Sequence, residues 1–249
     1  MFRIMKNNLS NRLLFLFSVA SVGLGVMGFY GPSRHMESDP PQRFDYLVRE
    51  DMFAGFRGDS SALHRAMTLC EDTLRANPNH SQALVWHGCA IWYLSGQAFQ
   101  SGDFQKGMAL SDSGMGEMDR AVELDSNNVA VRIPRGAAIL AAAPYLPEPN
   151  RTILLRKGLA DYERTYALQT RYFSKLSVHS RGELLGGMAD ACRRLGETER
   201  AEMYFSLITT ELQGSEYATR ANHWLETKEF GKPNSDLPPA TCIGCHTEN

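Results

Sequence analysis

The chain has 249 residues, of which 43% are hydrophobic and 22% are charged. This is the composition of a folded globular protein, and the chain is long enough to bury a substantial core. Its formal net charge is only -2, whereas proteins that bind nucleic acid carry a clustered basic surface, so we expect no nucleic-acid partner. The five cysteines are an odd number and do not fit a disulfide framework: they are Cys70, Cys89, Cys192, Cys242 and Cys245.

Residues 1–30 have the pattern of an export signal. Arg3, Lys6 and Arg12 precede an uncharged apolar stretch that runs from Leu13 to Tyr30, as in the basic and apolar regions of such signals. A helix of this stretch would be about 27 Å long, so it is long enough to remain as a membrane anchor. Cleavage as a signal peptide and burial as a core helix are the alternatives. Since the basic residues come first, we expect the rest of an anchored chain on the periplasmic side of a bacterial inner membrane.

Residues 31–43 contain three prolines and predict an exposed linker. Beyond it, residues 44–228 show apolar side chains at spacings of three and four with almost no strand pattern, which predicts an all-α domain. We expect four helical hairpins that stack, since each is too small to bury its apolar face alone. The expected helices include 63–74, 83–94, 108–124, 129–143, 152–168, 184–195 and 199–212.

The last of these hairpins resembles a tetratricopeptide repeat. Small and large apolar residues lie on either side of a turn glycine, Gly196, where that family carries its signature: Leu185, Met188, Ala189 and Cys192, then Ala201, Phe205 and Ile208. The run from Leu74 to Asn79 resembles the end of another repeat. The second unit departs from the pattern, with longer helices or an insertion around residues 97–107, and the third has a proline-rich hairpin. The resemblance implies a tetratricopeptide-like α-solenoid.

In that family the first helices of successive pairs line a concave groove that binds a protein partner. The resemblance therefore implies a binding face on residues 84–94, 129–143 and 181–195. Its candidate residues are Trp86, Trp92, Arg132, Arg135, His179 and Arg181. The arginines would clamp a carboxylate or phosphate. Alternatively, Arg132 and Arg135 form a solvated face paired with local acids, and the tryptophans belong to the repeat core.

The tail, residues 229–249, contains Cys242-Ile243-Gly244-Cys245-His246. This is the C-x-x-C-H attachment sequence of one covalent c-type haem. Cys242 and Cys245 would form thioethers to the haem vinyl groups, and His246 would be an axial ligand of the iron. Accidental matches are expected on the order of 0.003 times in a chain of this composition. A metal site without haem, a redox pair or disulfide, and an unmodified dithiol are the alternatives. The sixth iron ligand stays open, with His223 the nearest histidine in sequence.

Together these patterns predict an exported, membrane-anchored scaffold that binds a protein partner, such as a membrane redox complex, and carries haem c for electron transfer. One alternative is an assembly scaffold of the cell envelope without haem. Another is a peroxidase-like haem enzyme, although we find no phosphate-binding glycine loop and no hydrolase, metalloprotease or kinase motif. The sequence does not set the oligomeric state.

Overall fold

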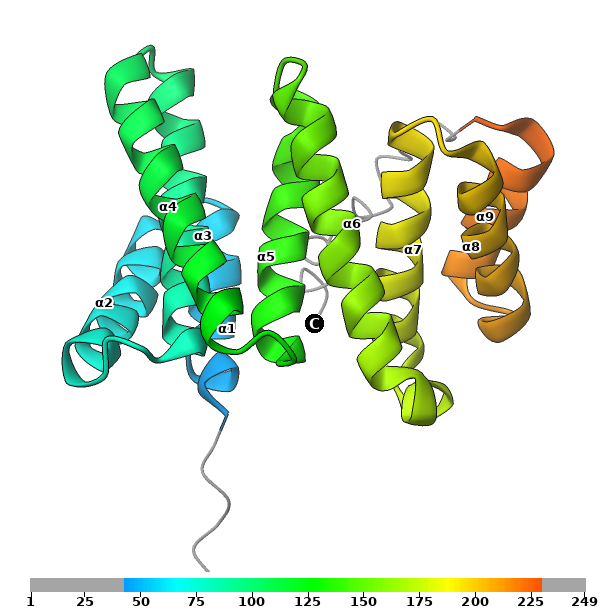
Figure 1. Ribbon diagram of the computed structural model, residues 1–249, viewed down its shortest axis with the longest axis horizontal. Helices are drawn as coiled ribbons and strands as arrows, with labels where there is room; N and C mark the ends of the chain where they lie inside the picture. The colour runs from blue at the N-terminus through cyan, green and yellow to red at the C-terminus, as the bar shows by residue number, and fades with distance from the viewer. Residues whose placement is uncertain (1–42, 230–249) are drawn as a thin grey trace, which may run out of the picture. The chain divides into compact units, whose positions relative to one another are not determined.

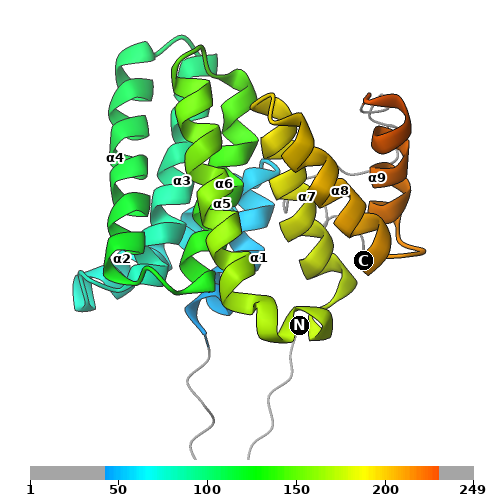
Figure 2. The same ribbon diagram turned by 45° about the vertical axis from the view of Figure 1, so that its right-hand side comes forward.

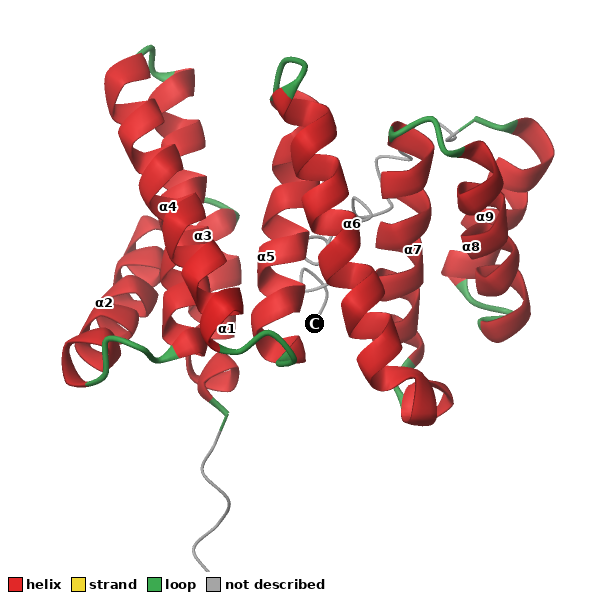
Figure 3. Ribbon diagram, in the orientation of Figure 1, coloured by secondary structure: helices red, strands yellow, loops and turns green. Residues whose placement is uncertain are grey.

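The computed structural model describes residues 43–229. Every regular element in this range is helical, with nine α-helices, two short 3-10 helices and no strand (Figure 3). The all-α prediction is therefore confirmed for residues 43–229. The α-helices are α1 Phe44–Phe56, α2 Ser60–Ala76, α3 Ser81–Gln100, α4 Phe104–Leu124, α5 Val129–Ala142, α6 Asn150–Gln169, α7 Val178–Arg194, α8 Thr198–Glu211 and α9 Glu216–Thr227, and the 3-10 helices are η1 Ala143–Tyr145 and η2 Thr170–Lys175.

The helices pack as consecutive antiparallel pairs, which is consistent with an α-solenoid (Figures 1 and 2). The pairs are α1 with α2, α3 with α4, α5 with α6, and α7 with α8, and α9 packs on α8. The first helices of the pairs also contact one another in the order α1, α3, α5, α7. Buried apolar side chains form two clusters, one over α1 to α5 and the other over α6 to α9.

The expected turn at Gly196 is confirmed, and Gly102 makes a similar turn earlier in the chain. Gly102 and Gly196 both have positive φ, at 84° and 74°, and join α3 to α4 and α7 to α8. The side chains of Asp59 and Asp103 accept hydrogen bonds from the backbone N–H groups at the starts of α2 and α4. The second helical pair departs from the repeat pattern because its helices are long: α3 has 20 residues and α4 has 21. The ninth helix, α9, follows the expected four hairpins as an additional element.

Two glycines bring α3 and α4 into close contact. A Cβ atom on Gly114 would lie 2.7 Å from the carbonyl oxygen of Gly88 and 2.8 Å from the backbone nitrogen of Trp92. A Cβ atom on Gly88 would lie 2.7 Å from the carbonyl oxygen of Gly114. The long second pair therefore depends on backbone-to-backbone packing that larger residues would prevent.

Between residues 43 and 229, no helix is both long enough and apolar enough to cross a membrane. The expected export segment at residues 1–30, most of the linker 31–43, and the tail with Cys242, Cys245 and His246 lie outside the described residues.

Candidate functional site

A cavity of about 420 Å³ lies along the first helices of the four pairs. Residues of α1, α3, α5 and α7 line it, together with Tyr162 and Gln169 of α6. Its apolar walls include Phe53, Ile133 and Leu184. The volume is within the range of small-molecule and cofactor sites, roughly 300–1,000 Å³. The cavity thus runs along the helices to which the tetratricopeptide resemblance pointed, and α1 is an added contributor.

The α1 side of the cavity carries stacked cationic side chains. The guanidinium groups of Arg43 and Arg49 lie 4.9 and 5.0 Å from the ring centroid of Tyr46. Arg43 also donates two hydrogen bonds to the buried carboxylate of Asp45, at 2.9 and 2.8 Å. Arg49 differs, because its buried Nε makes no hydrogen bond among the described residues and lies 3.7 Å from the exposed carboxylate of Glu50. The cavity therefore has one arginine hydrogen-bonded to a buried acid and one in a longer ion pair with an exposed acid, whose Nε could still donate a hydrogen bond.

On the α7 side, a chain of hydrogen bonds orients His179. Its Nδ1 lies 3.1 Å from the hydroxyl oxygen of Tyr217 on α9. The same hydroxyl donates to Oε1 of Glu183 at 2.8 Å. The Tyr217 hydroxyl thus links His179 and Glu183 in one hydrogen-bonded chain. His179 and Glu183 both line the cavity.

The two candidate tryptophans have different surroundings. Trp86 lines the cavity and is 5% exposed, with its ring 5.9 Å from that of Phe53 in an edge-on arrangement. Its indole N–H has no hydrogen-bond partner among residues 43–229. Trp92 packs half-buried against the first apolar cluster and is not among the residues that line the cavity.

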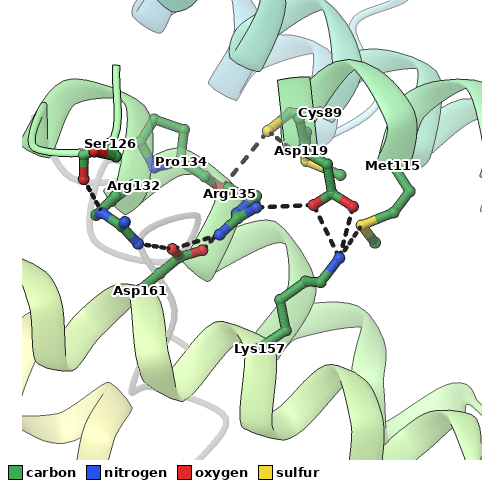
Figure 4. Close-up of polar contacts among 10 residues, drawn as sticks. Cys89, Met115, Asp119, Ser126, Arg132, Pro134, Arg135, Lys157 and Asp161 are labelled. Carbon is green, nitrogen blue, oxygen red and sulfur yellow. Dashed lines mark hydrogen bonds and ion pairs between the residues drawn. The ribbon is translucent and has the colours of Figure 1, made fainter. Parts of the chain in front are cut away.

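The two candidate arginines of α5 belong to an ion-pair network (Figure 4). Arg135 donates to the fully buried carboxylate of Asp161 at 2.6 and 2.7 Å and to Asp119 at 2.8 Å. Arg132 donates to Asp161 at 2.6 Å, and Lys157 contacts Asp119 at 2.7 Å. Burial lowers the pKa of Arg135, but its bonds to Asp161 and the charge of Asp119 outweigh this, and the net pKa is raised. The expected pairing of these arginines with acids is confirmed, but the expectation of a solvated face is wrong, because Arg135 and Asp161 are buried between the helices.

Arg181 faces α8 rather than the cavity. Its Nη1 donates to the backbone carbonyl of Glu211 at 3.1 Å and lies 3.6 Å from the carboxylate of the same residue. Of the six groove candidates, the structure therefore brings two to the cavity, Trp86 and His179.

The sequence reasoning missed the contribution of α1. The signal that identifies it is the spacing of Tyr46, Arg49, Phe53 and Phe56, which places four cavity-lining side chains on one helical face. The prediction began the helical domain in this region but named no side chain there.

The cysteines of the helical unit are buried and free: they are Cys70, Cys89 and Cys192. Burial raises the pKa of Cys70 to about 12 and that of Cys192 to about 11, and it also raises that of Cys89. No cluster of three or more histidine, cysteine or acidic side chains with the arrangement of a metal site occurs within residues 43–229. Because they are buried, these three thiols pack as small apolar core groups.

Comparisons with models of known protein families, with characterised proteins and with solved structures gave no match.

Proposed function

We propose that this protein is an exported, membrane-anchored electron-transfer scaffold on the periplasmic side of a bacterial inner membrane. It would bind a protein partner, such as a membrane redox complex, and hold one covalent c-type haem. The observation that carries this proposal is the sequence Cys242-x-x-Cys245-His246. The apolar segment 13–30 supports it independently, since bacterial c-type haem is attached outside the cytoplasm and the basic residues before this segment predict export.

The side chains of Cys242, Cys245 and His246 fit haem better than they fit a structural zinc ion. Two thiols at this spacing match the two vinyl groups, and the adjacent imidazole matches an iron ligand. A structural zinc site would need two further ligands. The three cysteines of the helical unit do not supply them, because they are buried and burial raises the pKa of each thiol. When bound, haem would supply reversible one-electron chemistry.

The helical unit would serve as a tetratricopeptide-like scaffold. Consecutive antiparallel pairs, a positive-φ turn glycine at Gly196 and small residues at helix contacts all support this assignment. Four stacked pairs exceed the roughly three repeats that such a solenoid needs to be stable, so the helical domain would serve to position a haem-bearing tail relative to a partner.

The proposal is tested by expressing the full chain together with the cytochrome maturation machinery. After denaturation and removal of loosely bound haem, the wild-type polypeptide should retain one haem, measured by absorbance and by mass. The Cys242→Ala/Cys245→Ala variant should retain none, because no thioether can form. A Cys192→Ala variant is the matched control, since its thiol is buried in α7, and it should keep the haem.

A wild-type chain that is helical by circular dichroism but leaves denaturation without haem would contradict the proposal. That result would favour a second function, an assembly scaffold of the cell envelope that binds a partner segment in the cavity. The specific observation behind this second candidate is the cavity along α1, α3, α5 and α7, which lies where a tetratricopeptide groove holds its partner.

A further inference from the structure

Two buried hydrogen-bond donors line the cavity without an acceptor among the described residues. Five buried side-chain polar atoms make no hydrogen bond within residues 43–229, and two of them belong to residues of the cavity lining. They are the indole Nε1 of Trp86, a residue that is 5% exposed, and the guanidinium Nε of Arg49. A buried donor without an acceptor is unfavourable, and native structures contain few of them. The cavity is therefore suited to a ligand that carries a hydrogen-bond acceptor.

Trp86 and Arg49 come from different helices but line the same region of the wall. The ring of Trp86 on α3 contacts that of Phe53 on α1 edge-on, with 5.9 Å between the centroids. Phe53 follows Arg49 by four residues within α1. Residues at this spacing are neighbours on one face of a helix. One acceptor group could therefore serve both donors.

The charges in this region favour an anionic acceptor. Arg43 and Arg49 of α1 both line the cavity, and Asp45 compensates Arg43 through two hydrogen bonds. Glu50, at 3.7 Å from Nε of Arg49, is too distant for a hydrogen bond, and it is exposed, so water screens its charge. A further carboxylate in the lining, Glu183, comes from α7 and accepts a hydrogen bond from a tyrosine of α9. Arg49 is therefore the cation that an incoming anion would meet.

The wall that α5 contributes is apolar. Its lining residues, none of which has a polar side chain, are Val129, Ala130, Ile133, Pro134, Ala137 and Ala138. A bound peptide would need hydrogen-bond partners for its backbone N–H and C=O groups, and these side chains supply none. An aliphatic or aromatic group needs only apolar contact. This wall therefore favours the apolar body of a small molecule over a peptide segment.

We propose that the cavity binds a small monocarboxylic acid with an apolar body. Its carboxylate would accept hydrogen bonds from Arg49 and from the indole N–H of Trp86, and its aliphatic or aromatic body would lie along α5. The volume of about 420 Å³ is in the range of sites for such molecules. The inference assigns the cavity to a small molecule instead of the partner segment of the second candidate function. It does not depend on the attachment of haem.

The test uses the full-length protein in detergent and phenylbutyrate as a soluble probe of this class. Isothermal titration calorimetry, with a blank of detergent alone, measures the dissociation constant. The matched neutral probe is phenylbutyramide, which has nearly the same size and keeps a carbonyl acceptor but carries no charge. We expect the acid to bind at least about tenfold more tightly than the amide, because hydrogen bonds to a charged acceptor are the stronger ones.

Three variants connect this preference to the proposed contacts. Arg49→Gln should bring the ratio of the two dissociation constants close to one. Trp86→Phe keeps an aromatic ring but loses the N–H group, and it should weaken binding of the acid by about threefold or more. Arg57→Gln, at an exposed arginine just after α1, is the matched control and should keep the wild-type ratio. Circular dichroism checks that each variant is folded, and the ratio of two probes within one variant does not depend on the fraction that folds.

Equal binding of the acid and the amide by wild type would overturn the inference, because the cavity would then be only an apolar slot. Failure of both probes to bind would also overturn it and would leave the cavity to a partner segment. An Arg49→Gln variant that still prefers the acid as strongly as wild type would contradict the assigned anion contact. These outcomes are separate from the proposed function, which stands or falls on the retention of haem after denaturation.

Discussion

Asp161 of α6 is a buried charged residue that depends on its partners for compensation. It is fully buried and accepts hydrogen bonds from Arg135 at 2.6 and 2.7 Å and from Arg132 at 2.6 Å (Figure 4). Removing one partner of a buried ion pair leaves the other charge without compensation, which costs far more than a surface pair is worth. The carboxylate therefore sets the conformation of both arginines.

We expect Asp161→Asn to lower the free energy of unfolding by about 3–5 kcal/mol, because Arg135 stays buried and charged without its main partner. Urea denaturation followed by circular dichroism measures this change. The matched control is Asp72→Asn, which breaks the exposed pair with Arg75 and should cost less than about 0.5 kcal/mol. Similar losses for the two variants would contradict the assigned role of Asp161.

Single residues also show where sequence reasoning reaches its limit. The burial of Cys70, Cys89 and Cys192 was predictable, since each lies on an apolar stripe of a helix. The ion-pair partner of Arg135 could not be predicted from the sequence. Asp161 is 26 residues away on the facing helix, and which acid pairs with Arg135 depends on how α5 packs against α6. Both the ligand-clamp and the ion-pair interpretations were consistent with the sequence.

Among the elements, α3 and α4 are joined by the closest backbone contact. The pair Gly88 and Gly114 leaves no room for a methyl group on either helix. Gly116, on the same helix as Gly114, has open space where its Cβ would be. Gly114 and Gly116 of α4 therefore offer a direct comparison of steric clash with helix propensity.

We expect Gly114→Ala to destabilise the protein by about 1–3 kcal/mol, because the added methyl group overlaps backbone atoms of α3. Gly116→Ala should have the opposite sign, a gain of about 0.5–1 kcal/mol, because alanine favours a helix over glycine. Thermal unfolding of both variants measures the difference. Equal midpoints for the two would show that α3 and α4 do not pack through Gly114.

The turn at Gly196 was easy to predict, because its signal is local. Several helix ends were not: α3 runs to Gln100 rather than to residue 94, and α7 begins at Val178 rather than at residue 184. The cavity could be assigned to the first helices only through the family resemblance. The contribution of α1 required the assembled structure, since its lining side chains meet α3, α5 and α7 only after the pairs stack.

At the scale of the whole molecule, His87 makes stability depend on pH. Its Nδ1 lies 2.7 Å from a carboxylate oxygen of Glu117 on α4, and its Nε2 lies 3.6 Å from Glu71 on α2. Burial lowers the pKa of His87, but the two carboxylates outweigh it and the net pKa is raised. A raised pKa in the folded state means that the charged imidazole stabilises the fold below its ordinary pKa of about 6.5 and that this contribution is lost as pH rises through the raised value.

We therefore expect His87→Gln to cost about 1.5 kcal/mol near pH 5.5 and clearly less near pH 8.5, because only the protonated ring makes charge-assisted bonds to the acids. Urea unfolding at the two pH values gives the difference between wild type and variant. His64→Gln, at an exposed position of α2, should leave that difference near zero at both. A cost that is independent of pH would mean that His87 contributes only packing.

The cavity spans both of the apolar clusters of the helical domain. Its lining runs from Arg43 of the first pair to Leu184 of the fourth, so it touches helices that belong to both clusters. Repeat proteins couple their units only through neighbours, and distant repeats can therefore open separately. An occupant of this cavity would contact both halves at once and would make them unfold as a single cooperative unit. The cavity could thus bind its occupant fully only in a molecule whose four helix pairs are all folded.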